Sequence, residues 1–264
     1  MPVIIIKKLL LSLLILSICW LPTFGSQHEM FSAQNKSAVV ADGGGDVEFP
    51  TISGLLARYY SGDVVSGDEP ADDTDVSTWQ DLGGSGYDIT QGNSSKQPSY
   101  NTNIINGRPA IYWDGSDDVL SNTSAWTPDA VPNTVVMVYS TESGSNYYFD
   151  GELGERNTLF VDGSDIEMFA GSQYDTGFNL TTSGWHYAFF IFDSTSSYAR
   201  IDGVDGSTGD SGTQTFGNEF WLGSRYSDNN FFKGYIAEVL VYDSALDSGE
   251  ISSLESYITD HYNL

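Results

Sequence analysis

The stretch between Gly234 and Asp243 constrains the fold of this chain more than any other. Its β-branched and aromatic residues predict a strand, and both faces of that strand are apolar except for Glu238. An apolar pattern on both faces is typical of a strand that is covered on both sides. Regular alternation assigns the apolar residues to two faces: Ile236, Leu240 and Tyr242 beside Glu238, and Tyr235, Ala237, Val239 and Val241 opposite. The sequence therefore predicts a buried strand close to the C-terminus.

A helix is predicted directly after this strand. Asp247 can cap the first free backbone amides, and Glu250 stands three residues further on, as in a capping box. Leu246 and Ile251 occupy the two positions of a hydrophobic staple. The apolar face of this helix continues through Ile251, Leu254 and Ile258. In the strand and the helix together, five residues are predicted to be buried: Ile236, Val239, Val241, Leu254 and Ile258.

Short strand-like segments recur through the preceding part of the chain, separated by turn residues. The clearest are 108–114, 133–141, 157–161, 185–193, 198–202 and 219–223. Asp-Gly pairs mark several of the turns between them. Aromatic residues make up 14% of the chain and are spread along these segments, which suits two sheets packed face to face. We therefore predict an all-β fold, a two-sheet antiparallel jelly-roll sandwich with one short C-terminal helix.

The first 25 residues have the pattern of a signal peptide. Lys7 and Lys8 form a positive region, an apolar run follows, and Thr23 and Gly25 are small residues suited to a cleavage site. The apolar run is shorter than the roughly 20 residues of a spanning helix, although an uncleaved anchor is a second interpretation. Three parts are predicted: a signal peptide (1–25), a flexible polar leader (26–50) and one folded domain (51–264). The predicted location is extracellular, either secreted or associated with a cell surface or a virion.

The charge of the chain limits its partners. Acidic residues number 36 against ten lysines and arginines, a formal net charge of −26, and removal of residues 1–25 would make it −28. Such a surface repels nucleic acid and anionic membranes, so neither is expected as a partner. Salt or bound cations reduce this self-repulsion, which favours a marine or other high-salt setting or a divalent-cation site. An ordinary acidic secreted protein is the alternative interpretation.

An ordered series of motifs runs through the chain. It comprises Gly-Leu-Leu-Ala-Arg-Tyr-Tyr at 54–60, Trp-Gln-Asp at 79–81, Gln-Pro-Ser-Tyr at 97–100, Asn-Gly-Arg-Pro at 106–109, Trp-Asp-Gly at 113–115, Trp-His at 185–186 and the closing strand. This series resembles the laminin-G-like, concanavalin-A-like jelly-roll domains of secreted and surface proteins, over roughly residues 52–264. The resemblance implies a jelly-roll sandwich with a role in recognition. The same fold hosts lectins, adhesion modules and glycoside hydrolases, so the fold alone does not select a function.

The sequence offers little support for catalysis. The closing strand contains Glu238, but Asp243 is five residues away and is expected on the opposite face. Glu152 and Glu155 lie in a glycine-rich turn, and the chain has no nucleophile elbow or phosphate-binding loop. His186 is separated in sequence from the other histidines and is interpreted as a hydrogen-bonded structural residue. We therefore expect no enzymatic activity, and a glycoside hydrolase or polysaccharide lyase is the less favoured alternative.

The best candidate metal site is a cluster of aspartates. Asp114, Asp117 and Asp118 place three carboxylates within five residues around a glycine turn. Hard cations such as Ca²⁺ prefer several such oxygens close together, and the repulsion between like charges favours a bound cation. The alternative is a tight turn in which these carboxylates cap backbone amides. Calcium is accordingly the predicted cofactor, with these three residues as its ligands.

Candidate ligand-binding residues come from aromatic and polar side chains in predicted turns. Sugar-binding surfaces need exposed aromatic faces beside hydrogen-bonding groups. The residues that fit this description are Tyr147, Tyr148, Tyr226, Asp228 and Asn230. With the export signal and the resemblance, they favour a non-catalytic recognition or adhesion module that binds a glycan or a surface protein. The alternative is a structural envelope or capsid decoration domain without a ligand pocket.

Overall fold

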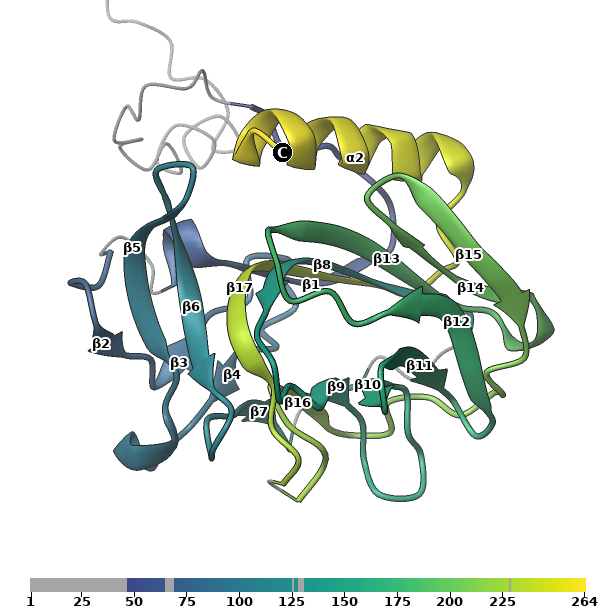
Figure 1. Ribbon diagram of the computed structural model, residues 1–264, viewed down its shortest axis with the longest axis horizontal. Helices are drawn as coiled ribbons and strands as arrows, with labels where there is room; N and C mark the ends of the chain where they lie inside the picture. The colour runs from purple at the N-terminus through teal and green to yellow at the C-terminus, as the bar shows by residue number, and fades with distance from the viewer. Residues whose placement is uncertain (1–46, 65–68, 125, 128–130, 228) are drawn as a thin grey trace, which may run out of the picture. The chain divides into compact units, whose positions relative to one another are not determined.

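The computed structural model describes residues 47–264 except 65–68, 125, 128–130 and 228, so the predicted signal peptide and most of the predicted leader lie outside the described residues. Two antiparallel sheets face each other, and one short helix, α2 (Ser248–Tyr262), lies across the outer side of one of them (Figure 1). This arrangement confirms the predicted jelly-roll sandwich with a C-terminal helix. In the described part of the chain, no helix is long and apolar enough to cross a membrane.

The sheet beneath the helix has nine strands, and β17 lies within it. In order they are β15 (Val204–Gly209), β14 (Ser197–Ile201), β13 (His186–Phe192), β8 (Asn133–Thr141), β17 (Lys233–Tyr242), β6 (Arg108–Asp114), β5 (Ser99–Ile105) and β2 (Thr74–Asp75), with β1 (Leu55–Tyr60) also paired to β17. The predicted strands 108–114 and 133–141 match β6 and β8 at both ends.

The second sheet has eight shorter strands. In order they are β12 (Gln173–Asn179), β11 (Asp165–Phe169), β10 (Thr158–Asp162), β9 (Tyr147–Asp150), β16 (Phe220–Leu222), β7 (Leu120–Asn122), β4 (Ile89–Thr90) and β3 (Thr78–Trp79). Three single 3₁₀ turns complete the described elements: η1 (Ser61–Asp63), η2 (Ser94–Lys96) and η3 (Ser194–Ser196).

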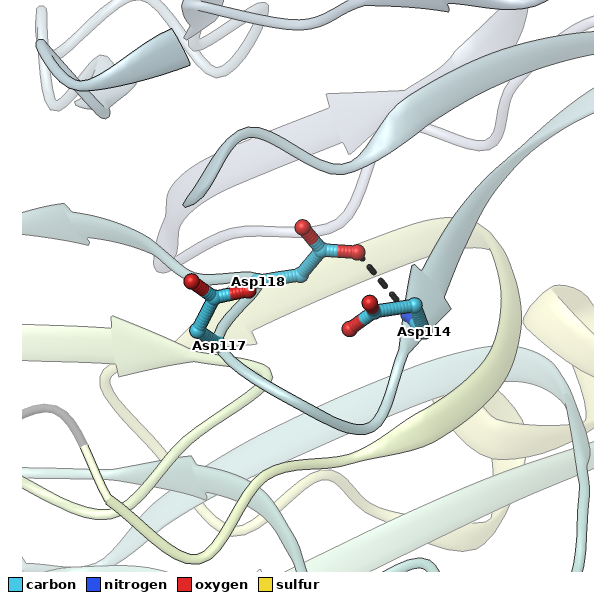
Figure 2. A group of neighbouring side chains, drawn as sticks. All are labelled: Asp114, Asp117 and Asp118. Carbon is cyan, nitrogen blue, oxygen red and sulfur yellow. Dashed lines mark hydrogen bonds between the residues drawn. The ribbon is translucent and has the colours of Figure 1, made fainter. Parts of the chain in front are cut away.

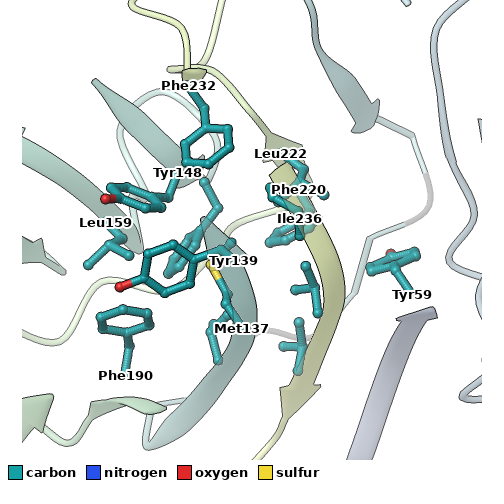
Figure 3. Packing of buried hydrophobic residues seen from close by; sticks show 14 of the residues in the cluster. Tyr59, Met137, Tyr139, Tyr148, Leu159, Phe190, Phe220, Leu222, Phe232 and Ile236 are labelled. Carbon is teal, nitrogen blue, oxygen red and sulfur yellow. The ribbon is translucent and has the colours of Figure 1, made fainter. Parts of the chain in front are cut away.

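Aromatic side chains fill much of the space between the two sheets. Tyr139, Tyr148, Phe190 and Phe232 gather there with aliphatic residues (Figure 3). The ring centroid of Tyr148 lies 5.4 Å from that of Tyr139 and 5.0 Å from that of Phe232. Each such ring removes a large apolar area from water, so a core of this kind stabilises the sandwich without disulfide bonds.

Strand β17 carries a bulge that changes the predicted assignment of its faces. Its pairing register with β8 shifts between Ile236 and Glu238. As a result Ile236 packs between the sheets with Val239, whereas Ala237 packs under the helix with Leu240. The prediction that Ile236 shares the face of Leu240 and Tyr242 was therefore wrong, as was the placement of Tyr235 and Ala237 with Val239, because an extra residue in the strand interrupts the alternation.

Helix α2 is held on the nine-stranded sheet by a buried carboxylate. Glu238 is 1% exposed and accepts hydrogen bonds from Arg58 Nε (2.8 Å), Tyr257 Oη (3.1 Å) and Tyr262 Oη (3.0 Å). The predicted capping box at Asp247 is confirmed, with the Asp247 side chain accepting from the third helical amide. The five residues predicted to be buried are all 0% exposed: Ile236, Val239, Val241, Leu254 and Ile258. Glu238 is thus a structural residue that joins strand to helix.

Candidate functional site

The outer face of the eight-stranded sheet carries a row of side chains that changes from aromatic to acidic. Leu159 and Met168 point into the core, so their neighbours Phe160 and Glu167 point outward. The register pairs Tyr147 with Phe160, Phe160 with Glu167, and Glu167 with Asp175. The row therefore crosses four adjacent strands, β9 to β12.

The aromatic end of the row is joined by two arginines and a loop tyrosine. The rings of Tyr147 and Phe160 stack with centroids 5.2 Å apart. Tyr226 comes from the loop after β16, and the guanidinium carbons of Arg156 and Arg225 lie 5.1 and 4.8 Å from the centre of its ring. The same carbons lie 5.7 and 5.9 Å from the ring of Tyr147. We call these five partly exposed residues the aromatic–arginine cluster.

A buried carboxylate beneath the cluster fixes its geometry. Asp150 is fully buried and pairs with Arg156, whose Nη2 lies 2.8 Å from Asp150 Oδ2. The same oxygen accepts from the backbone N–H of Tyr226 (3.0 Å), and Oδ1 accepts from that of Gly151 (2.9 Å). Burial raises the pKa of Asp150, while its hydrogen bonds to Arg156 act in the opposite direction. One carboxylate therefore positions both an arginine and the loop that carries Tyr226.

Two of the predicted ligand-binding residues, Tyr147 and Tyr226, come together in this cluster. Asn230 is exposed in the same loop, and its carbonyl accepts a hydrogen bond from the Tyr147 backbone N–H at 3.3 Å. Asp228 lies outside the described residues.

Tyr148 is not a surface residue, contrary to the prediction. It is 0% exposed, and its hydroxyl lies 3.2 Å from Thr141 Oγ1 inside the sandwich. The reason is the alternation of strand β9, which turns two consecutive tyrosines to opposite faces of the sheet. Tyr148 is therefore part of the core between the sheets, as Figure 3 shows.

Sequence reasoning missed three members of the cluster: Phe160, Arg156 and Arg225. Phe160 stands between Leu159 and Val161 in an apolar segment, so its outward direction is set by the register and not by its type. The sequence signal for the arginines was the Arg225-Tyr226 pair, because an arginine beside a predicted surface tyrosine is notable in a chain with only ten lysines and arginines.

The acidic end of the row brings three carboxylates together. Asp165, Glu167 and Asp175 each offer an oxygen, and these atoms lie within 4.8 Å of one another. Glu167 is 7% exposed, and its Oε2 has no hydrogen-bond partner among the described residues. Burial and the neighbouring carboxylates raise the pKa of Glu167. The sequence analysis missed this group, whose signal is the spacing Asp165-x-Glu167 on one strand.

The three aspartates predicted to bind calcium do lie together, in the turn between β6 and β7 (Figure 2). Asp118 Oδ2 accepts a hydrogen bond from the Asp114 backbone N–H (2.8 Å), and Asp114 Oδ1 accepts from Ser116 N–H (2.7 Å). Burial, with the charges of Asp114 and Asp117, raises the pKa of Asp118 to about 7. Two carboxylates thus cap backbone amides of the turn. Each of the three aspartates also offers one carboxylate oxygen within 4.8 Å of the others, and hard oxygen donors of this kind could hold a Ca²⁺ ion.

His186 lies beside a mostly apolar cavity of about 250 Å³ whose walls include Tyr139, Phe178 and Ile201. Its Nδ1 is 2.6 Å from Asp202 Oδ2, and this hydrogen bond raises the pKa of His186 although burial opposes the effect. The interpretation of His186 as a hydrogen-bonded residue is confirmed.

A sequence model of the concanavalin A-like lectin/glucanases superfamily matches residues 162–252, which confirms over this stretch the resemblance predicted from the motifs. No curated protein sequence matches the chain.

Solved structures with similar folds include an arabinanase domain and a sialidase. Domain 4 of AbnA, a GH43 extracellular arabinanase from Geobacillus stearothermophilus in complex with arabinotriose, is 18% identical with a TM-score of 0.56, and the match covers 76% of this chain and 97% of that domain. A Trypanosoma rangeli sialidase in complex with sialic acid is 15% identical with a TM-score of 0.51, and the match covers 80% of this chain and 34% of the sialidase. This chain thus spans about a third of the sialidase.

At these identities the similarity establishes the fold and not an activity. Residues 162–252 carry the sequence pattern of the concanavalin A-like lectin/glucanase superfamily, within a two-sheet sandwich of the kind found in those solved structures.

Proposed function

We propose that this chain is an exported, non-catalytic carbohydrate-binding module that recognises glycans at a cell, virion or matrix surface. The observation that carries the proposal is the aromatic–arginine cluster. Tyr147, Phe160 and Tyr226 present partly exposed rings on one sheet face, and the loop that holds Tyr226 adds the exposed polar side chain of Asn230. Aromatic faces beside hydrogen-bonding groups are the elements from which sugar-binding surfaces are built.

The hydrogen bonding within the cluster supports a binding role. The buried carboxylate of Asp150 joins the side chain of Arg156 to the backbone of the Tyr226 loop, so these two parts of the cluster are connected before any ligand arrives. A surface that is already ordered loses less conformational entropy when it binds. The solved domain in complex with arabinotriose has a similar fold, which is consistent with a carbohydrate as the ligand class.

A glycan array with the purified chain tests the proposal, first without and then with Ca²⁺. For a glycan bound by the parent, Tyr226→Ala should weaken binding by about tenfold or more, the loss of roughly 1.4 kcal/mol expected for a central aromatic contact. Tyr112→Ala is the matched control, because Tyr112 is a half-buried tyrosine packed on Tyr235 in the other sheet, with ring centroids 4.8 Å apart.

The outcomes separate the candidate functions. Binding lost in Tyr226→Ala and kept in Tyr112→Ala supports the module and its site. The reverse pattern contradicts the site, and an array without any bound glycan contradicts the function. If no glycan binds in the array and no activity is found in an enzymatic assay, the alternative of a structural envelope or capsid decoration domain is favoured.

A glycosidase is the second candidate, because of the acidic end of the row. Retaining glycosidases use two carboxyl groups about 5–5.5 Å apart, of which one has a raised pKa and acts as the acid. Glu167 has a raised pKa, and Asp165 and Asp175 each offer an oxygen within 4.8 Å of it. However, Glu167 is only 7% exposed, which leaves little of its carboxyl group for a substrate to contact, so we favour binding over catalysis.

Release of reducing sugar from a panel of polysaccharides tests this second candidate. If the parent releases sugar and Glu167→Gln does not, while both melt at similar temperatures, the non-catalytic assignment is wrong. We expect no release by either protein.

A further inference from the structure

The aromatic–arginine cluster contains two guanidinium groups but one carboxylate partner. Arg156 is paired with Asp150. Arg225 lies against the same tyrosine rings, yet among the described residues no carboxylate lies within ion-pair distance of it. Its side chain has one hydrogen bond, from Nη2 to the neutral hydroxyl of Tyr226 at 3.4 Å, and its buried Nε has no partner in the described part of the chain. Among the described residues, one positive charge in the cluster is therefore without a carboxylate partner.

This arrangement differs from that of other arginines in the chain. Arg58 pairs with Glu238 at 2.8 Å, and Arg200 pairs with both Glu255 and Asp205 at 2.7 Å. Acidic residues outnumber lysines and arginines by 36 to 10, so carboxylates are abundant. The lack of a carboxylate beside Arg225 in the described part of the chain is therefore not explained by composition.

We propose that the saccharide bound at this cluster is acidic and that its carboxylate or sulfate group pairs with Arg225. This inference rests on the carbohydrate-binding function proposed above and specifies its ligand class. A guanidinium group presents several N–H donors in one plane, which match two oxygens of a carboxylate or sulfate. The tyrosine faces beside Arg225 would contact the apolar face of the same sugar ring.

The negative charge of the whole chain does not prevent this contact. At about 0.15 M salt the field of distant charges decays over roughly 8 Å, whereas the pairing at Arg225 is a direct contact. Nucleic acid remains disfavoured, because it carries a charge on every nucleotide and would be repelled along its whole length. An acidic glycan with fewer charges can place one of them at Arg225 and its uncharged parts elsewhere.

The test is titration calorimetry at 0.15 M salt with matched pairs of acidic and neutral glycans, alongside an array that includes both classes. Galacturonic acid and its methyl ester differ in the carboxylate, and galactose 6-sulfate and galactose differ in the sulfate, and each acidic member carries a single charge. These two pairs distinguish the two sources of the anion. The parent is compared with Arg225→Gln, which removes the charge, and Arg225→Lys, which keeps the charge but not the planar group of donors. Arg200→Gln removes an arginine from the other sheet and is the control for overall charge.

We expect the array to select acidic glycans and the acidic member of a pair to bind more tightly than its neutral counterpart. Arg225→Gln should weaken this binding by about ten- to a hundredfold, the loss expected for a charge-assisted hydrogen bond, with an intermediate effect for Arg225→Lys. Arg200→Gln should bind like the parent. Melting curves show whether each variant is folded. If Arg225→Gln does not fold, the binding of acidic glycans is compared between the parent and Arg225→Lys.

Binding confined to neutral glycans, or binding of acidic glycans that both Arg225 variants retain, overturns this inference and leaves the proposed function in place. An array in which nothing binds overturns both. The two failures are therefore distinguishable.

Discussion

Replacing Glu238 with glutamine should destabilise the domain, because it leaves a buried charge without its partner. The carboxylate is 1% exposed and accepts from Arg58 and two tyrosines, and the Arg58 side chain is 16% exposed. Removing one partner of a buried ion pair costs about 3–5 kcal/mol. Arg58 also lies 3.9 Å from the centre of the Phe49 ring, and the new amide oxygen can still accept one hydrogen bond. We therefore expect a loss near the lower limit, about 3 kcal/mol.

Chemical denaturation followed by circular dichroism measures this loss, and a thermal melt gives a second reading. For a domain of this size, about 3 kcal/mol corresponds to a decrease in Tm of roughly 6–12 °C. Tyr262→Phe removes a single neutral donor to Glu238 and should have a smaller effect. The double variant Arg58→Met/Glu238→Leu removes both charges, so it should be more stable than Glu238→Gln alone.

Two results would refute this reasoning. One is a Glu238→Gln protein within about 1 kcal/mol of the parent, the typical net value of an ordinary hydrogen bond. The other is a double variant less stable than Glu238→Gln, which would mean that the unpaired charge is not the cause of the loss.

Three further predictions concern the helix, the aspartate turn and the histidine. Ile258→Ala should cost about 2–5 kcal/mol in denaturation, because Ile258 is 0% exposed, and parental stability would mean that the helix is not docked. The pKa of Asp118 near 7 lies above its unfolded value of about 3.9, so the folded protein binds more protons than the unfolded chain between these pH values. Without divalent cations, the free energy of unfolding should therefore fall as pH rises from about 4 to 7, by at most about 1.4 kcal/mol per pH unit. Asp118→Asn should remove this slope and also the rise in Tm that we expect from millimolar Ca²⁺; stabilisation that follows ionic strength alone, equally with Na⁺, would contradict the site. Because its hydrogen bond to Asp202 raises the pKa of His186, the stability that this pair contributes is complete below about pH 6.5 and is lost as pH rises through the folded-state pKa. NMR titration should give a lower pKa of His186 in Asp202→Asn. An unchanged pKa would contradict the role of the hydrogen bond between His186 and Asp202.

Local signals in the sequence were sufficient to predict much of the fold. The capping box at Asp247 and the helical spacing of Leu254 and Ile258 involve residues within one or two turns of each other, so the pattern could be read without the structure. The strands at 108–114 and 133–141 were also evident, since their turn residues and apolar runs lie side by side in the chain.

The site was harder to predict because it depends on how strands pair. Tyr147 and Tyr148 are chemically identical neighbours, and only the orientation of β9 decides that one faces outward and the other is buried. Arg225 approaches Tyr147 through a loop some eighty residues further along the chain, a contact that no local pattern encodes. The bulge in β17 likewise arises from its pairing with β8.

The position of β17 has a consequence for how the domain assembles. This strand pairs with β1, β6 and β8, and the bond between Arg58 and Glu238 joins residues 180 positions apart. No early portion of the chain can therefore complete the nine-stranded sheet, because its central strand follows all the others in sequence. Contacts this distant are slow to form. Until residues 233–242 have emerged, β8 and β6 lack the neighbour that joins them, and a fragment that ends before this strand should expose unpaired edges and aggregate.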